Sequence, residues 1–271
     1  MTAHLSRLGL FTAVVLSAAV LAAQELPENS SGVAEYYDVA GRPCFVFLPK
    51  IKDAGPQPWV FYAPAFRGRY PDTHEGWMHE QFLKAGVAVA GIDVGEAYGS
   101  PKGRESFDAF YKSLVERDFA TKPCLLGRSR GGLWVTSWAG ANPDKVAGLA
   151  GIYPVFDFRT YPGLEKAAGA YEMSAAELEK KVAELNPIEQ AGNLAKAKIP
   201  VYFIHGDVDK VVPLKENSLE FVTRYKAAGA ANLAELTVPA GQGHNFWEGF
   251  FRDPKLIAFT IAKAKAGAEA K

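Results

Sequence analysis

The strongest constraint on the fold is an alternation of apolar runs with helix-like segments along most of the chain. Short continuous apolar runs are typical of strands that are covered on both faces of a sheet. Strands are predicted at residues 44–49, 59–66, 87–94, 123–129, 146–155, 199–207 and 234–241. Because strands that alternate with helices pair in parallel through right-handed crossovers, we expect an α/β fold with a mostly parallel sheet and helices on both faces.

Helix signals occur between these runs. Residues 103–117 carry apolar side chains at three- and four-residue spacing. Residues 75–86 and 214–229 each end in a glycine, which is typical of a helix C-cap. A last helix is predicted to begin at Asp253-Pro254, where an N-cap residue precedes a proline at the first helical position.

The length of the chain fits one domain. It has 271 residues, of which 48% are hydrophobic, and this is enough for one large core. We expect a single domain over residues 24–271. A polar, helix-like segment at about residues 157–195 interrupts the alternation, and we expect it to form a small lid over the carboxyl edge of the sheet. The alternative is a surface insertion without a function.

The first 23 residues differ from the rest. Arg7 precedes an apolar run from Leu8 to Ala23, and small residues lie near its end. This pattern is typical of a secretory signal peptide, so residues 1–23 are expected to be removed after Ala22 or Ala23. The mature protein is then expected to be periplasmic or secreted, without stable membrane association. The alternative is an uncleaved anchor, although the run is shorter than the ~20 residues that a span needs.

Charge and cysteine content exclude several classes of function. Lys+Arg and Asp+Glu both number 30, so the formal net charge is zero and no basic excess indicates a nucleic-acid partner. Cys44 and Cys124 are the two cysteines. They lie in predicted buried strands and are expected to be free thiols, although export permits a disulfide. Their spacing gives no zinc pattern.

One serine stands in a special context. Ser129 is the centre of the sequence GRSRG (127–131), and Gly132 follows directly. The form G-x-S-x-G between a strand and a helix is typical of the nucleophile elbow of α/β-hydrolases. The glycines leave room for a close crossing of strand and helix. Ser129 is therefore the predicted nucleophile.

A serine hydroxyl needs a neighbouring base to become a good nucleophile. His244 follows the last predicted strand in a glycine-rich loop, which places it at the same sheet edge as Ser129. His244 is the predicted base. Among the other histidines, His205 is expected to be packed and hydrogen-bonded, whereas His74 and His79 are expected to be solvated side chains on or near a helix.

The base needs a carboxylate to orient it. The stretch HGDVDKVVP supplies Asp207 and Asp209. It resembles the H-G-x-x-D-x-x-V-P segment of α/β-hydrolases of the prolyl oligopeptidase and dienelactone hydrolase type. The resemblance covers roughly residues 44–265 and implies an α/β-hydrolase fold with Asp209 as the triad acid. Asp207 is the second choice, with a loop-capping role. The order Ser129, Asp209, His244 is the one expected of this fold.

Catalysis of acyl transfer also needs donors for the developing oxyanion. The backbone N–H of Arg130, the residue after the nucleophile, is one expected donor. The second is expected from the loop after the strand at 59–66. Pro64 has no N–H, so the donor is Ala65 or Phe66, and we expect Phe66.

Several charged residues surround the elbow. The stretch GRSRGG is similar, over its own length alone, to the G-x-S-R-x-G elbow of glucuronoyl esterases. Guanidinium groups pair bidentately with carboxylates, so one hypothesis is that Arg130 or Arg67 binds a substrate carboxylate or reinforces the oxyanion hole. The alternative is structural ion pairs with Glu96, Asp93 or lid acids. The expected substrate-binding residues are Arg67, Arg128 and Tyr98.

Together these features predict an exported serine hydrolase that cleaves a carboxylic ester through an acyl-enzyme. The expected substrate is a small-molecule or carbohydrate ester, and the mechanism needs no metal or organic cofactor. One alternative is a serine peptidase of the prolyl oligopeptidase type, although the chain is too short to carry the propeller domain of those enzymes. The other is a non-catalytic binding protein with a hydrolase fold.

Overall fold

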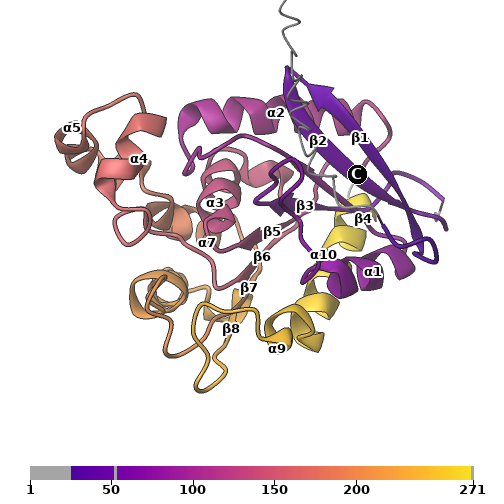
Figure 1. Ribbon diagram of the computed structural model, residues 1–271. Helices are drawn as coiled ribbons and strands as arrows, with labels where there is room; N and C mark the ends of the chain where they lie inside the picture. The colour runs from indigo at the N-terminus through magenta and orange to yellow at the C-terminus, as the bar shows by residue number, and fades with distance from the viewer. Residues whose placement is uncertain (1–25, 52–53, 270–271) are drawn as a thin grey trace, which may run out of the picture.

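One mixed sheet organises the molecule. Figure 1 shows the computed structural model, which describes residues 26–51 and 54–269. Within these residues, eight strands form a sheet in the order β1-β2-β4-β3-β5-β6-β7-β8. Their bounds are β1 (Gly32–Val39), β2 (Arg42–Pro49), β3 (Trp59–Ala63), β4 (Ala88–Ile92), β5 (Cys124–Arg128), β6 (Gly148–Ile152), β7 (Val201–Ile204) and β8 (Ala234–Thr237). The pairs from β4 to β8 are parallel, whereas β2 pairs antiparallel with both β1 and β4. The predicted mostly parallel α/β sheet is confirmed.

The central strands have the burial that their apolar runs predict. Every residue of β3, β4, β5, β6 and β7 is buried. Strand β1 has no counterpart among the predicted strands. Only its first residue, Gly32, is buried, and Val33 and Tyr36 are exposed. Because β1 is an edge strand that pairs with β2 alone, it carries no continuous apolar run.

Helices cover both faces of the sheet (Figure 1). Helices α1 and α10 cover one face, where Phe82 and Leu256 belong to one apolar cluster. Helices α2, α3 and α8 cover the other, where Phe110, Trp138 and Phe221 belong to a second cluster. The bounds of these helices are α1 (Gly76–Lys84), α2 (Pro101–Val115), α3 (Gly131–Ala141), α8 (Glu220–Ala227) and α10 (Pro254–Glu269). A π-helical turn, η3 (Lys215–Leu219), precedes α8. The Asp253 carboxylate accepts the Leu256 amide at 2.6 Å, as an N-cap of α10 does.

The insertion at 157–195 lies between β6 and β7. It contains α4 (Leu164–Ala170), α5 (Ala175–Lys180), α6 (Val182–Leu185), η2 (Pro187–Gln190) and α7 (Ala191–Lys196). In Figure 1, α4 and α5 lie beyond α3, at the side of the molecule. Both η2 and α7 pack against α3, and the Tyr171 hydroxyl donates to the Tyr98 carbonyl at 2.9 Å. The insertion therefore covers the helical layer on one face of the sheet.

Two further expectations concern the leader and the cysteines. The predicted leader, residues 1–23, lies outside the described residues. No helix within the described ranges is long and apolar enough to span a membrane. Cys44 and Cys124 are both buried and free, as expected. Burial raises the pKa of the Cys44 thiol to about 12, so this thiol is protonated at neutral pH.

Candidate active site

Ser129 lies on a sharp turn between β5 and α3. Its φ angle is 50°, in the left-handed region that is unfavourable for a residue with a Cβ. A Cβ on Gly131 would lie 2.2 Å from the carbonyl oxygen of Ala63, and one on Gly132 would lie 2.5 Å from that of Val155. Glycine is therefore required on the helical side of the turn, because neighbouring backbone approaches too closely for any side chain.

Three side chains at the carboxyl edge of the sheet form a hydrogen-bonded chain. Ser129 Oγ lies 2.8 Å from His244 Nε2, and His244 Nδ1 lies 2.8 Å from Asp209 Oδ2. Ser129 follows β5, Asp209 follows β7, and His244 follows β8. The structure thus brings together the three residues predicted as nucleophile, acid and base. Such a chain allows the imidazole to accept the serine proton while the carboxylate orients the ring.

The environment of Asp209 favours its ionised form. Its side chain is fully buried, and Oδ1 accepts the amides of Val211 and Val212 at 2.9 and 2.8 Å. Burial by itself raises the pKa of this carboxyl, but hydrogen bonds from His205, His244 and the Val212 amide outweigh burial and hold the pKa well below its usual range. Asp209 is therefore a carboxylate at any pH at which the protein would work.

A pocket of about 220 Å³ opens at Ser129 and His244. The ring of Tyr153 packs on the His244 imidazole with 4.4 Å between centroids. Tyr161 is the residue that the insertion contributes to the lining. The full lining is Pro64, Tyr70, Arg128, Ser129, Arg130, Tyr153, Tyr161, Val211, His244, Asn245 and Phe246.

The backbone amides near Ser129 differ in their availability. Within the described residues, no acceptor is hydrogen-bonded to the Arg130 amide, as an oxyanion donor requires. The Phe66 amide donates to the Tyr70 carbonyl at 3.1 Å, within its own turn. This bond corrects the expectation that Phe66 is the second donor. The Ala65 amide, the other candidate, has no acceptor among the described residues.

Arg128 lies in a buried ion-pair cluster. Its side chain is 5% exposed and pairs with Glu75 and, at 3.2 Å, with Asp72. The Tyr62 hydroxyl donates to the same Glu75. Nη1 of the guanidinium is therefore paired with carboxylates of the chain itself, while Arg128 also lines the Ser129 pocket. That Arg128 binds a substrate group stays a prediction. Burial raises the pKa of Glu75 to about 7 although Arg128 opposes this shift.

The ion-pair cluster also contacts the loop that carries His244. His74 Nδ1 lies 2.9 Å from Asp72 Oδ1. The His74 ring stacks on Phe246 with 4.0 Å between centroids and 18° between planes. The Arg128 guanidinium lies 5.5 Å from the centroid of the same Phe246 ring. Residues before α1 thereby contact the loop after β8 that carries His244, beside the Ser129 pocket.

The remaining predicted substrate residues lie apart from Ser129. Arg67 lies on the turn after β3 and lines a different pocket. Tyr98 is 9% exposed, belongs to an apolar core cluster, and is not among the residues that line the Ser129 pocket. The Arg130 side chain pairs with Glu96. The alternative of a structural ion pair is therefore the arrangement seen for Arg130.

The other histidines occupy two kinds of site. His79 is 1% exposed, which corrects the expectation of a solvated side chain. It packs against the rings of Tyr62 and Phe82, and burial lowers its pKa to about 3. His205 is packed and hydrogen-bonded, as expected. Its Nε2 lies 2.9 Å from the Val212 carbonyl oxygen.

Three residues of the site had no sequence signal of their own, and a fourth had one indirect indication. Tyr70, Glu75 and Phe246 come from turns and loops, and only the fold brings Tyr70 and Phe246 to the Ser129 pocket and Glu75 to Arg128. Tyr153 directly follows β6, so its position at a strand end was the one available indication. In the described part of the chain, no three His, Cys, Asp or Glu side chains group as a metal site.

The sequence matches a known family over more than half of its length. Residues 103–261 match the prolyl oligopeptidase family. This segment contains Ser129, Asp209 and His244 in that order. Comparison with curated protein sequences gives no match.

Solved structures share the fold. A puromycin-hydrolyzing peptidase of Mycobacterium tuberculosis superposes with a TM-score of 0.66 at 17% identity, covering 85% of this chain and 40% of that one. S-formylglutathione hydrolase (FrmB) from Staphylococcus aureus gives 0.65 at 13% identity, covering 85% and 98%. Est1E from Butyrivibrio proteoclasticus gives 0.58 at 20% identity, covering 87% and 98%. The predicted α/β-hydrolase fold is confirmed, and the chain spans less than half the length of the peptidase.

Proposed function

The chain belongs to the prolyl oligopeptidase family and is a serine hydrolase, and from this premise we propose that it hydrolyses a carboxylic ester, including one carried on a carbohydrate, with Ser129 as the nucleophile. The observation that carries the proposal is the hydrogen-bonded chain from Asp209 through His244 to Ser129.

The reaction follows from this geometry in two halves. His244 Nε2 takes the Ser129 proton while Oγ attacks the ester carbonyl carbon, and the carbonyl oxygen becomes an oxyanion. In this proposal the Arg130 amide donates to that oxyanion. His244 then gives the proton to the leaving alcohol oxygen as its bond to the acyl carbon breaks.

The acyl-enzyme is released by the same groups. His244 takes a proton from a water molecule, whose oxygen attacks the acyl carbon. The second oxyanion collapses, the bond to Oγ breaks, and the proton returns to Ser129. Asp209 stays ionised throughout, consistent with its lowered pKa, and stabilises the imidazolium that forms in each half.

Ester hydrolases among the structures that share the fold support an ester as the substrate. Est1E and S-formylglutathione hydrolase each match this chain over 98% of their own length. The family is nevertheless named for peptide cleavage, so a peptidase is the second candidate. Parallel assays with neutral esters, acidic esters, acetylated sugars and peptide amides separate the two. Faster turnover of the amides would replace the ester proposal by the peptidase.

The direct test is covalent labelling with a fluorophosphonate, followed by intact mass. We expect one adduct on the wild-type protein, mapped to Ser129, and none on Ser129→Ala. Ser174→Ala removes an exposed serine of the insertion and serves as the matched control, which should still be labelled. An adduct on folded Ser129→Ala, or none on the wild type, would contradict the proposed nucleophile.

We also propose that residues 1–23 direct export and are removed. The supporting pattern is the cation, the apolar run and the small residues of the leader. Expression in a bacterium with intact-mass analysis of the periplasmic fraction tests it. A mature chain that begins at Ala23 or Gln24 is expected, and a full-length chain retained in the cytoplasm would overturn it.

A further inference from the structure

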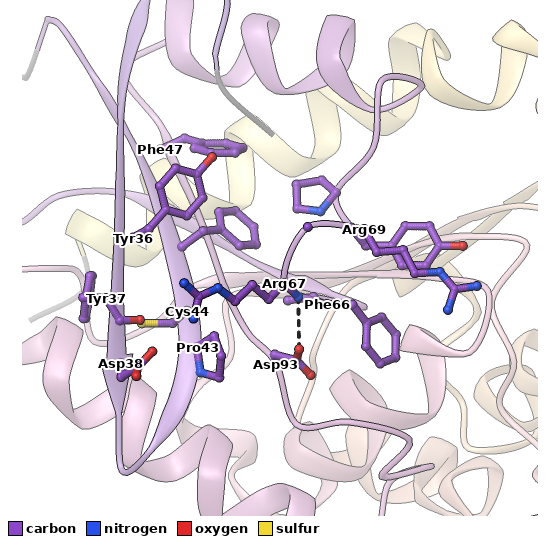
Figure 2. A pocket seen from close by; sticks show the side chains of 15 residues that line it. Tyr36, Tyr37, Asp38, Pro43, Cys44, Phe47, Phe66, Arg67, Arg69 and Asp93 are labelled. Atoms are coloured by element: carbon purple, nitrogen blue, oxygen red, sulfur yellow. Dashed lines mark hydrogen bonds between the residues drawn. The ribbon is translucent and has the colours of Figure 1, made fainter. Parts of the chain in front are cut away.

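A second and larger pocket lies on the other side of the turn after β3. Its volume is about 410 Å³, against about 220 Å³ at Ser129. Figure 2 shows it between the β1–β2 hairpin and the turn. Its lining is Tyr36, Tyr37, Asp38, Pro43, Cys44, Phe45, Phe47, Ala65, Phe66, Arg67, Gly68, Arg69, Tyr70, Pro71 and Asp93. Tyr70 lines both pockets, so a ligand in one pocket lies next to a ligand in the other.

Arg67 is the polar group that is poised for a ligand. Its side chain extends from the turn toward the hairpin (Figure 2). Its amide is fixed by Asp93 Oδ2 at 3.0 Å, and Asp93 Oδ1 accepts the Gly95 amide at 2.9 Å. Within the described residues, the Arg67 guanidinium forms no hydrogen bond or ion pair. This distinguishes it from Arg128 and Arg130, which are paired inside the protein.

The hairpin supplies the other chemistry of this pocket. Tyr36 is 44% exposed and meets Phe47 edge to face, with 6.4 Å between ring centroids. Phe45 packs on Phe47 at 4.7 Å. Asp38, an exposed residue two positions along β1 from Tyr36, presents a carboxylate to the same pocket. An aromatic wall, the Arg67 guanidinium and the Asp38 carboxylate therefore face the same space. Of the other charged residues in the lining, Arg69 lies over the Tyr70 ring at 5.4 Å and Asp93 accepts backbone amides.

We propose that this pocket binds a hexuronate unit of a carbohydrate substrate, next to the unit whose ester Ser129 cleaves. The inference rests on the proposed function for the position of the scissile ester. The uronate carboxylate pairs with Arg67, as planar guanidinium and carboxylate groups do. A sugar hydroxyl donates to Asp38, which as a carboxylate can only accept. The apolar face of the sugar ring packs on the aromatic wall.

This ligand uses all three features, whereas simpler ligands leave one unused. A neutral sugar leaves Arg67 without a charged partner, and a simple aromatic carboxylate has no hydroxyl for Asp38. A zwitterionic aromatic amino acid would also meet Arg67, Asp38 and the wall, but it cannot be linked to the sugar unit whose ester Ser129 cleaves. D-glucuronate, D-glucose and L-phenylalanine are therefore the three probes that separate these chemistries.

Binding of each probe to the wild-type protein is measured by titration with nuclear magnetic resonance. We expect D-glucuronate to bind and D-glucose to bind at least about tenfold more weakly, because one charge-assisted hydrogen-bond pair is lost. Arg67→Ala should weaken D-glucuronate binding by about tenfold and leave D-glucose binding unchanged. Arg252→Ala removes an exposed arginine outside both pockets and should have no effect.

The outcomes separate this proposal from the proposed function, because binding does not require hydrolysis. Equal binding of D-glucose and D-glucuronate, or equal weakening by Arg67→Ala and Arg252→Ala, would overturn the uronate site. Tighter binding of L-phenylalanine would replace it by an amino-acid site. Fluorophosphonate labelling of the same wild-type preparation reports on Ser129 independently, so labelled protein that fails to bind D-glucuronate refutes the subsite alone.

Discussion

Asp207 and Asp209 stand two residues apart but occupy different environments. Asp209 Oδ1 accepts two amides and Oδ2 accepts from His244. Asp207 is exposed and accepts the Gly241 amide at 2.7 Å, which ties the loop after β7 to the loop after β8. At the scale of the residue, the role of each aspartate therefore depends on its burial and on the hydrogen-bond donors around its carboxylate. The residue type alone does not determine that role.

This difference gives a prediction for the two aspartates. Asp209→Asn is expected to lower kcat by on the order of 10³- to 10⁴-fold, because an amide cannot hold the His244 tautomer that accepts the serine proton. Asp207→Asn, the matched control, should keep kcat within about threefold because Asp207 contacts no reacting group. Steady-state kinetics of both variants on one ester measures this difference. A larger loss of kcat in Asp207→Asn than in Asp209→Asn would mean that Asp207 is the triad acid.

Glu75 leads to a prediction on stability and pH. Its pKa rises from an ordinary 4.5 to about 7 in the folded protein, chiefly through burial. The folded state therefore binds this proton more tightly than the unfolded state. The stability from this proton is fully present below pH 4.5 and is lost as the pH rises through about 7. Glu75→Gln should flatten the fall in melting temperature between pH 5 and pH 8.

Glu80, in the helix that directly follows Glu75, provides the control for this prediction. Burial raises its pKa, but hydrogen bonds from Ser31 and Ser30 together outweigh burial and the pKa is lowered. Its contribution is present above its unfolded pKa and is lost at acid pH. Glu80→Gln should therefore leave the slope between pH 5 and pH 8 unchanged. A slope that persists in the Glu75 variant would show that another group carries it.

At the scale of the element, the strand–turn–helix unit around Ser129 is fixed by contacts with its neighbours. The Ser129 amide donates to the Ile152 carbonyl at 3.0 Å, and the Ser129 carbonyl accepts the Val155 amide at 2.8 Å. The turn is thus held on the segment at the end of β6. The end of β3 also approaches Gly131 closely, which fixes the helical side of the turn. The strained serine is supported by these elements rather than by its own preference.

A matched pair of glycine substitutions tests the element. Gly131→Ala should cost about 1–3 kcal/mol or more, because its Cβ would lie 2.2 Å from the Ala63 carbonyl oxygen and the backbone must move. Gly169→Ala, in α4, meets nothing within 4 Å and should stabilise the protein by up to about 1 kcal/mol. Urea unfolding of both variants measures it. Equal effects would mean that the crossing at Ser129 is not tight.

At the scale of the whole molecule, one sheet separates two apolar cores. Phe82 of α1 belongs to one core and Phe110 of α2 to the other, and neither is exposed. The central strands contribute side chains to both cores. Phe61 faces one and Tyr62 the other. Because each strand serves both cores, neither core is expected to unfold without the other.

This coupling gives a prediction on cooperativity. Phe82→Ala and Phe110→Ala should each destabilise the protein by about 3–5 kcal/mol and lower the midpoint of one common transition. Far-ultraviolet and near-ultraviolet circular dichroism, followed through urea unfolding, should give coincident curves for both variants. Separate transitions in either variant would show that the two faces unfold independently.

Local patterns in the sequence are enough to predict the central sheet and the order of Ser129, Asp209 and His244 along it. Buried parallel strands need continuous apolar runs, and the elbow needs glycines, so both leave local signals. Strand β1 left none, because an edge strand with one pairing partner tolerates mixed side chains.

Which polar groups already have a partner within the protein depends on the folded structure. The Phe66 amide bonds to Tyr70, and the Arg128 side chain pairs with Glu75, a residue 53 positions away. His79 is buried although its neighbours in sequence are mixed. Each of these contacts forms only in the folded chain. A local sequence pattern therefore cannot predict which residue will be the partner. For the same reason, only the fold reveals the pocket between the hairpin and the Arg67 turn.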